Sequence, residues 1–306
     1  MRLGPYSGAV RLDRRSRELL GSARIGMLAF SAGAGRPPLV NPAAFNYSAG
    51  SIWITTSRFA AKLQLARRDP RAAFLVDARG ESLLLQGLLD VYDLRSLSGQ
   101  LRAALSGPAF AWSLTGYALK NATFVGGYLL DLARIPSEWW PQNRVVLRLR
   151  PHRGRALVHT LAPAARPSRL PVAPPGVARS LARVSKGYVC WINRGLPFLT
   201  PALWSASGST LLTAFAAGEP SVPRGPAALV VESHHRFRAT RMVGACARGE
   251  LEPDPRAGGA MHRRYGVDRD DLGAGLRLDV DRVTWWRGFN VETTVRRRRH
   301  ADAARD

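Results

Sequence analysis

The segment Ile54-TTSRFAAKLQLARRDPRAAFLV-Asp77 sets the pattern from which the rest of the chain is interpreted. It begins with β-forming residues, continues with helical spacing over residues 58–68 and ends in a second apolar run over residues 72–76. This order predicts a strand, a helix and a second strand. The apolar face of the predicted helix, expected to pack on the sheet, is formed by Phe59, Leu63 and Ala66.

The start of this predicted helix combines hydroxyl groups with cations. Thr56 and Ser57 fall where an N-cap belongs. Arg58 and Lys62, four residues apart, share one side of the helix. Because helix N-termini and nearby cations bind phosphate groups, these residues form a predicted phosphate site. The alternative is a solvated surface helix with ordinary basic residues.

The composition describes a large folded chain with a strong positive charge. The 306 residues carry 45 Lys and Arg against 22 acidic residues, a net charge of +23. Only three of these cations are lysines, and Ala, Gly and Pro are abundant, so the charge reflects a compositional bias toward arginine. No specific nucleic-acid partner is predicted from it. The three lysines, Lys62, Lys120 and Lys186, are therefore of interest for their compact ammonium groups.

Metal, leader and membrane signals are weak. Cys190 and Cys246 are the only cysteines, and their separation fits neither a zinc site nor a disulfide framework, so no metal site is predicted. The N-terminus lacks the apolar run of a secretory signal, which makes a cytoplasmic location the default expectation. The apolar region 108–133 is interrupted by polar residues, so it predicts a buried or interfacial helical pair and no transmembrane segment.

The chain in order predicts a mainly β protein with α insertions. Short apolar runs separated by Gly-rich and Pro-rich turns predict antiparallel strands at 25–31, 39–47, 51–55, 72–77, 82–92 and 145–150. The predicted organisation is a first β-barrel domain at 1–160 with a helical insert at about 94–140, an extended, exposed Pro-rich linker at 161–180, a second barrel domain at 181–292 and a basic tail at 293–306.

The second half repeats the first in six blocks that keep their order and approximate spacing. Among them, the block at 201–204 matches 42–45, the block at 249–252 matches 87–90, and the block at 276–282 matches 147–153. Thr213 is aligned with Thr56. The repeat fails at 214–223, where both the cations and the helix propensity are missing. This pattern predicts a duplicated scaffold with a phosphate site in the first copy alone.

These blocks resemble the FMN-binding split-barrel superfamily, which includes pyridoxamine-phosphate oxidases and flavin or deazaflavin reductases. The resemblance rests on the strand at 39–45, the Gly50 hairpin, Thr56 before the helix, Lys62 ahead of Asp69-Pro70 and the Gly87 strand. It covers residues 20–93 and, more faintly, 183–254. It implies two tandem six-stranded antiparallel split barrels packed as a pseudo-dimer, with one competent site between them.

The resemblance also implies the ligand-binding residues. Thr56, Ser57, Arg58 and Lys62 are expected at the cofactor phosphate, with Arg58 in place of a cation that the family often has next to Lys62. The backbone of Asn41, Pro42 and Ala43 is expected against the flavin ring, with Ser82 beside it. Trp286 and Arg287 are expected to reach the site from the second barrel, and packing of Trp286 at the edge of a core is the alternative.

The predicted function is an oxidoreductase that binds FMN or a deazaflavin and acts on a small molecule of unknown identity. No side chain is identified as a general acid or base, so catalytic residues stay unknown. The helical insert either covers the cofactor pocket or adds packing between the barrels. The chain is expected as a monomeric pseudo-dimer or a homodimer. The alternative function is a non-catalytic binder of haem, lipid or an anionic ligand, with haem the less favoured cofactor.

Overall fold

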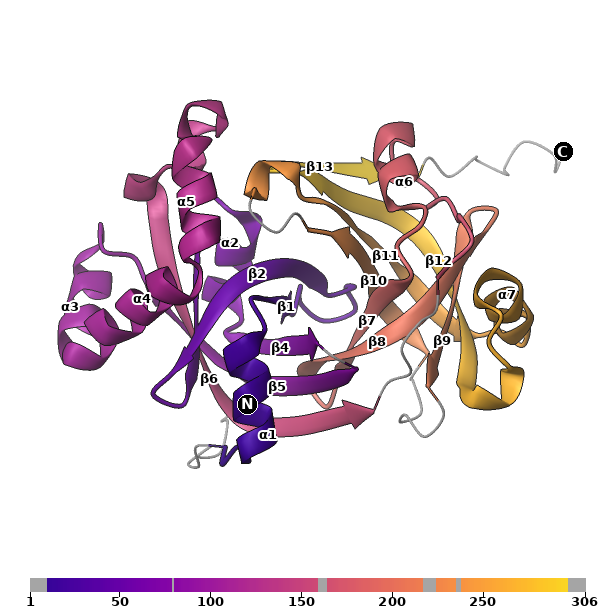
Figure 1. Ribbon diagram of the computed structural model, residues 1–306, viewed down its shortest axis with the longest axis horizontal. Helices are drawn as coiled ribbons and strands as arrows, with labels where there is room; N and C mark the ends of the chain where they lie inside the picture. The colour runs from indigo at the N-terminus through magenta and orange to yellow at the C-terminus, as the bar shows by residue number, and fades with distance from the viewer. Residues whose placement is uncertain (1–9, 79, 159–163, 217–223, 235–237, 297–306) are drawn as a thin grey trace, which may run out of the picture.

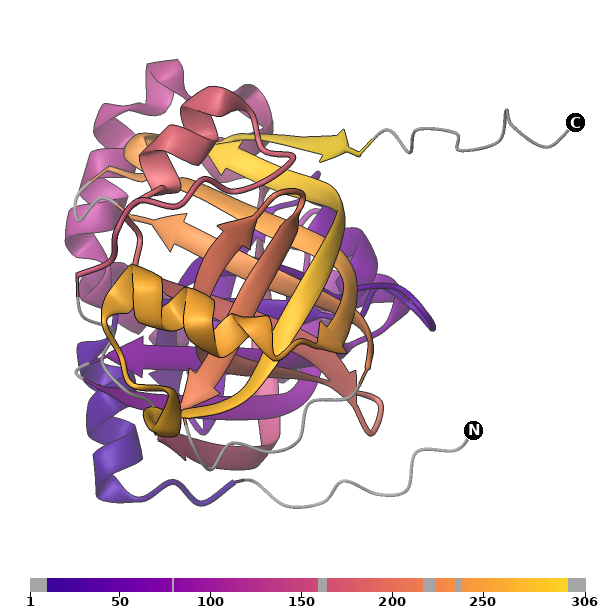
Figure 2. The same ribbon diagram turned by 90° about the vertical axis from the view of Figure 1, so that its right-hand side faces the viewer.

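The computed structural model of the chain describes residues 10–296 apart from residues 79, 159–163, 217–223 and 235–237. Two β-barrels lie side by side, the first on the left of Figure 1 in indigo to magenta and the second on the right in orange to yellow. Helices α3 (Leu97–Leu105), α4 (Pro108–Lys120) and α5 (Ala122–Leu130) lie on the outer side of the first barrel, and Figure 2 shows α7 (Arg256–Tyr265) covering the second.

The first barrel consists of six antiparallel strands, close to those predicted. It closes in the order β1-β2-β3-β6-β5-β4. Its interior is filled by apolar side chains such as Phe45, Ile54 and Phe74, which are fully buried. The strands are β1 (Ile25–Phe30), β2 (Leu39–Ser48), β3 (Ser51–Ser57), β4 (Arg71–Ala78), β5 (Glu81–Tyr92) and β6 (Arg144–Val158).

The second barrel has the same strand order. Its sheet runs β11-β10-β7-β8-β9-β12, and pairing of β11 with β12 closes the ring. One further strand, β13 (Asn290–Val295), pairs with β12 and continues into the predicted tail. The predicted fold, two tandem six-stranded antiparallel barrels with helices, is confirmed. The six strands are β7 (Lys186–Asn193), β8 (Leu196–Ser207), β9 (Thr210–Ala216), β10 (Gly225–Ser233), β11 (Val243–Pro253) and β12 (Leu272–Arg287).

The two barrels also share register and irregularities. Met27 pairs with Pro42 in the first barrel, and Tyr188 pairs with Pro201 in the second. The register shifts between Gln86 and Gly87 in one barrel and between Arg248 and Gly249 in the other. A Cβ added at Gly87 would lie 2.0 Å from the Arg150 carbonyl oxygen, and one at Gly249 1.7 Å from that of Asp279. Both bulges therefore require glycine, because the opposite backbone fills the space of a side chain.

The shared register corrects one detail of the predicted repeat. Phe45 pairs with Ile54, and its counterpart Trp204 pairs with Thr213. Thr213 therefore takes the place of Ile54, two residues before the position that was predicted. Residues 217–223, where the copy of the helix after β3 was predicted to fail, lie outside the described residues.

The helical insert between β5 and β6 comprises three α-helices and three short 3-10 helices. The α-helices are α3 (Leu97–Leu105), α4 (Pro108–Lys120) and α5 (Ala122–Leu130), and the 3-10 helices are Leu132–Arg134, Ser137–Trp139 and Pro141–Asn143. The remaining helices are α1 (Arg14–Ser22), α2 (Ala61–Arg68), α6 (Pro175–Leu181), α7 (Arg256–Tyr265) and two 3-10 helices at Ala239–Arg241 and Arg269–Asp271.

The start of α2 and the Pro-rich stretch differ from the predictions. Strand β3 continues through Ser57, and α2 begins only at Ala61, after an Ala60 cap that makes no side-chain hydrogen bond. Phe59 therefore precedes the helix and is 59% exposed, whereas Leu63 is buried as predicted. The Pro-rich stretch is not simply extended and exposed, because it contains α6 and its Leu170 and Val177 are buried.

The barrels pack through one continuous apolar core. It joins Met27, Val40 and Leu75 of the first barrel to residues of the second such as Trp191 and Phe198. An ion pair of 2.8 Å between Asp77 and Lys186 crosses the same interface. The insert reaches the second barrel as well, where the buried Asp131 carboxylate accepts hydrogen bonds from Arg238 and Thr240. None of the helices in the described part of the chain is long and apolar enough to span a membrane.

Candidate functional site

A groove of about 1720 Å³ lies between the two barrels. One wall comes from β2, the end of β3 and the start of α2 in the first barrel. The opposite wall comes from the β11, β12 and β13 strands of the second barrel, and the insert adds Tyr117, Phe124 and Trp139. Ligand pockets for one small molecule are typically about 300–1,000 Å³. The groove therefore has room for a cofactor and a second molecule.

Asn41, Pro42 and Ala43, which the resemblance places against a flavin ring, line the groove from β2. Residues 39–44 of this strand pair with β1 along one edge, whereas pairing with β3 begins only at Phe45. Along 39–44, the second edge of β2 has no paired strand in the described part of the chain. Its backbone N–H and C=O groups are thus suited to hydrogen bonds with the edge of a planar, polar ring.

Two partly buried cations on the first-barrel wall, Lys62 and Arg144, have no acidic partner among the described residues. Lys62, in the first turn of α2, makes no ion pair or hydrogen bond among the described residues. Burial, with a further contribution from nearby Arg144, lowers the pKa of its ammonium group from 10.5 to about 8. Arg144, the first residue of β6, donates from one nitrogen to the Thr55 hydroxyl at 2.8 Å, while its Nη1 is buried without a partner.

The geometry of β3 selects which hydroxyl groups face these cations. Side chains alternate along a strand, so Thr55 and Ser57 line the groove. Thr56 points the other way with Ile52 and Ile54, is fully buried, and its hydroxyl oxygen has no partner. The expectation for Ser57 is consistent with this geometry, whereas Thr56 faces the barrel interior. Thr55 is a lining residue that the sequence analysis missed.

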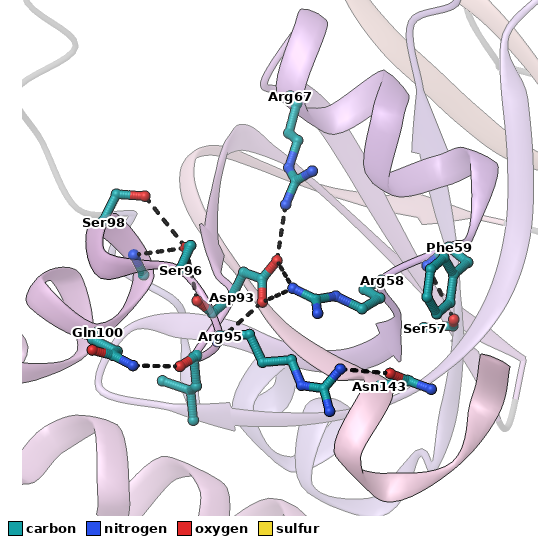
Figure 3. A network of polar contacts seen from close by, with 12 residues as sticks. Ser57, Arg58, Phe59, Arg67, Asp93, Arg95, Ser96, Ser98, Gln100 and Asn143 are labelled. Atoms are coloured by element: carbon teal, nitrogen blue, oxygen red, sulfur yellow. Dashed lines mark hydrogen bonds and ion pairs between the residues drawn. The ribbon is translucent and has the colours of Figure 1, made fainter. Parts of the chain in front are cut away.

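Arg58 does not reach the groove, because it is held by Asp93. Figure 3 shows its guanidinium group donating to both carboxylate oxygens of Asp93, each at 2.8 Å, with Arg67 donating to the same carboxylate at 3.1 Å. Asp93 is buried, and its pKa is lowered mainly by its hydrogen bonds from Arg58 and the Arg95 backbone, which outweigh the burial. Arg58 therefore binds Asp93 at the point where β5 leads into the insert. At the predicted phosphate site, Arg144 is the second cation beside Lys62.

Two other predicted residues lie away from the groove. Ser82 is buried and donates a hydrogen bond to Asp77, beside the ion pair that joins the barrels. Trp286 lines the groove, but Arg287 is exposed because the next residue of a strand faces the opposite side.

The second-barrel wall offers unsatisfied hydrogen-bond donors and aromatic surface. The Nε of Arg248 and the indole Nε1 of Trp286 are both buried without partners. Arg248 also donates to the Thr284 hydroxyl at 2.8 Å, which fixes its direction. Trp139 of the insert packs on Phe289 with ring centroids 5.2 Å apart, across the two barrels. This end of the groove can therefore hold the polar and flat parts of one ligand.

The second barrel lacks counterparts of the polar residues at the first-barrel wall. The register places Phe215 at the position of Thr56 and Ala216 at that of Ser57. Leu272 pairs with Ala216, as Arg144 pairs with Ser57. The duplicated framework therefore carries the cation and hydroxyl set once among the described residues.

The described residues that line the groove include no His or Cys, but Tyr117 and Met242, two further residue types that can bind haem iron, are among them. The described residues contain no cluster of three or more His, Cys, Asp or Glu side chains able to hold a metal ion.

Searches with protein-family models and among curated proteins give no match. Three similar solved structures are a protein of Listeria innocua named for pyridoxamine 5'-phosphate oxidase, an FAD-binding protein of Mesorhizobium loti and an F420 reductase. Their identities are 18%, 17% and 20%, and their TM-scores 0.30, 0.31 and 0.28. The matches cover 47%, 47% and 45% of this chain and 95%, 94% and 94% of the others. Each match thus extends over about half of this chain and nearly all of the other protein.

Proposed function

We propose that the groove binds one phosphate-bearing flavin or deazaflavin per chain and that the protein is an oxidoreductase for a small-molecule substrate. The observation that carries the proposal is the pair formed by Lys62 and Arg144. Both side chains line the groove, and neither has an acidic partner among the described residues. Burying two unpaired like charges is unfavourable, so the site is complementary to an anion that neutralises both.

The phosphate group would lie between these two cations and the groove-facing hydroxyl of Ser57. The Ser57 hydroxyl accepts from the Phe59 N–H at 3.1 Å and donates its single proton to the Glu138 carbonyl at 2.5 Å, so a hydrogen bond to a bound phosphate would replace the bond to Glu138. The first N–H groups of α2 lie beside Lys62 and receive no side-chain cap, which adds partial positive charge.

The ring would lie along the unpaired edge of β2, at Asn41 to Ala43, and against the second barrel. Backbone groups at this edge orient a planar ring, and Trp286 with Arg248 supplies donors that are otherwise unsatisfied. A bound flavin or deazaflavin supplies the electron or hydride transfer itself. The protein residues bind it, orient it and exclude water from one side.

The test is the absorbance spectrum of the purified protein, followed by titration with FMN and with a deazaflavin such as F420. We expect a flavin or deazaflavin band and one equivalent bound per chain. Arg144→Met should weaken binding roughly tenfold to a hundredfold, the value of one or two charge-assisted hydrogen bonds. Arg58→Met is the matched control, since it removes the same charge outside the groove. A Soret band, two equivalents per chain or unchanged affinity in Arg144→Met would refute the proposal.

A further inference from the structure

The helical insert exposes an unusual amount of large apolar side-chain surface. Leu97, Leu105, Trp112, Leu119 and Leu130 are between 72% and 85% exposed. Leu94, Leu101 and Leu129 add further exposed surface on the same three helices and their entry. Exposed apolar residues scattered singly are common, but a cluster of this size marks an interaction surface.

The exposed leucine and tryptophan side chains of α3 and α4 are called the outer face of the insert. Leu97, Leu101 and Leu105 repeat every four residues in α3, and Trp112 and Leu119 are seven apart in α4, so each set follows one side of its helix. The inner sides of both helices pack on a cluster outside the first barrel that contains Trp53, Tyr92 and Phe110. Figure 1 shows α3 and α4 side by side, at the end of the molecule farthest from the second barrel.

The charge of the insert indicates what this surface contacts. From Leu94 to Leu130 the sequence contains no acidic residue and three cations, Arg95, Arg102 and Lys120. Arg95 and Arg102 are exposed beside the apolar stripes. A second copy of the same face would bring like charges together, whereas an anionic surface would neutralise them. Apolar side chains with a Trp and flanking arginines are typical of helices that lie in a lipid interface.

We propose that the outer face of the insert binds the surface of an anionic lipid bilayer, with α3 and α4 lying in the interface. The inner face of the same insert contributes Tyr117 and Phe124 to the groove. Helix α4 would thus contact lipid on one side and the groove, through Tyr117, on the other. This inference does not depend on which cofactor the groove binds.

The test is co-sedimentation of the full chain with vesicles of phosphatidylcholine containing one quarter phosphatidylserine, compared with vesicles of phosphatidylcholine alone. We expect binding to the anionic vesicles, and a loss of roughly tenfold or more in affinity in the triple variant Leu101→Ser, Trp112→Ser, Leu119→Ser. Because these side chains are exposed, the variant should unfold at nearly the temperature of the parent. Val295→Ser, which removes an exposed apolar side chain from β13, is the control and should bind normally.

The triple variant keeps every charge of the parent, which separates this proposal from general attraction of a basic protein. Equal vesicle binding by the variant and the parent would overturn the proposal. Absence of binding to anionic vesicles would overturn it as well. A third outcome would also overturn it: the parent forms a dimer in light scattering, the triple variant does not, and neither binds vesicles. A second copy of the chain would then be the occupant of this surface.

Discussion

Replacing Lys62 by methionine should make the unliganded protein more stable at neutral pH. The ammonium group has a pKa of about 8 in the folded chain against 10.5 as its ordinary value, because it is desolvated and lies near Arg144. At about 1.4 kcal/mol for each pH unit, the fall of the pKa from 10.5 to about 8 sets an upper limit of about 3.4 kcal/mol on the cost of the charge. Water around the half-buried side chain reduces this, so we expect a gain of about 1–2 kcal/mol at pH 7.

The stability that Lys62→Met gains over the parent should become smaller as the pH rises. The folded-state pKa of Lys62 is lowered, so between about pH 8 and 10.5 the unfolded chain holds a proton that the folded chain has released. The parent therefore becomes more stable as pH rises through this window, and the advantage of Lys62→Met should disappear by its upper end. Lys120, whose pKa burial also lowers to about 8, is present in both proteins and cancels from the difference.

Ligand binding should make the parent more stable than the Lys62→Met variant. At a concentration one hundred times its Kd, FMN or another ligand stabilises the folded parent by about 2.7 kcal/mol, and Lys62→Met should lose most of this. The assay is urea unfolding at pH 7 and pH 10, with and without FMN. Arg183→Met removes an exposed charge that does not line the groove and controls for net charge. A Lys62→Met variant less stable than the parent at pH 7, or stabilised equally by FMN, would refute the reasoning.

Three further substitutions test the placement of individual residues. Arg58→Met should lower the unfolding free energy by about 1–3 kcal/mol, since it leaves a buried carboxylate short of a partner, and should leave FMN affinity unchanged in titration. Thr56→Val should keep both FMN affinity and stability to within about 1 kcal/mol, because its hydroxyl is buried and unsatisfied; weakened FMN binding would contradict this assignment. Gly249→Ala should cost more than about 3 kcal/mol in urea unfolding because its Cβ would meet the Asp279 carbonyl oxygen, whereas Gly21→Ala, in open space in α1, should be neutral or stabilising.

The strands and their repetition could be predicted from sequence because both depend on local patterns. Alternating apolar residues bounded by glycine turns predicted all six strands of the first barrel, and the blocks around Gly87 and Gly249 matched because each forms the same bulge. These signals are contained within about ten residues of sequence. Antiparallel neighbours then place them in the same sheet.

The site residues were harder to predict because small shifts and distant partners decide them. The predicted helix start lay too early, and a change of one residue along β3 exchanges the groove face for the barrel interior. The expected N-cap position and the family motif favour Thr56, whereas Thr55 is the residue whose side chain lines the groove. Arg58 is predicted at the phosphate from its place near the expected helix start. Its actual partner, Asp93, lies 35 residues further along the chain and gives no local signal in the sequence. Arg144 is the first residue of β6 and pairs with Ser57. This pairing joins residues far apart in the sequence, so Arg144 can be assigned to the site only once the strand register is known.

The three lysines of this arginine-rich chain each occupy a confined position, as their rarity in the composition suggested. Lys62 faces the groove without a partner, and Lys120 donates to the Leu20 carbonyl at 2.6 Å while lying 3.8 Å from the centre of the Phe45 ring. Lys186 pairs with the buried Asp77 across the barrels. Each site contains a compact ammonium group in confined surroundings, where the broad guanidinium group of arginine would fit less well.

The two walls of the groove differ because each barrel contributes a different set of residues. The first barrel presents the ends of β2 and β3 with cations and hydroxyl groups, whereas the second presents β11 to β13 with Arg248 and Trp286. At the positions equivalent to these two, the first barrel has Gln86 and Leu157. A symmetric pair of sites would need both sets in both barrels, and each barrel carries only one of them among its described residues. Duplication therefore allowed the two halves of a single groove to diverge, which is why we expect one ligand for each chain.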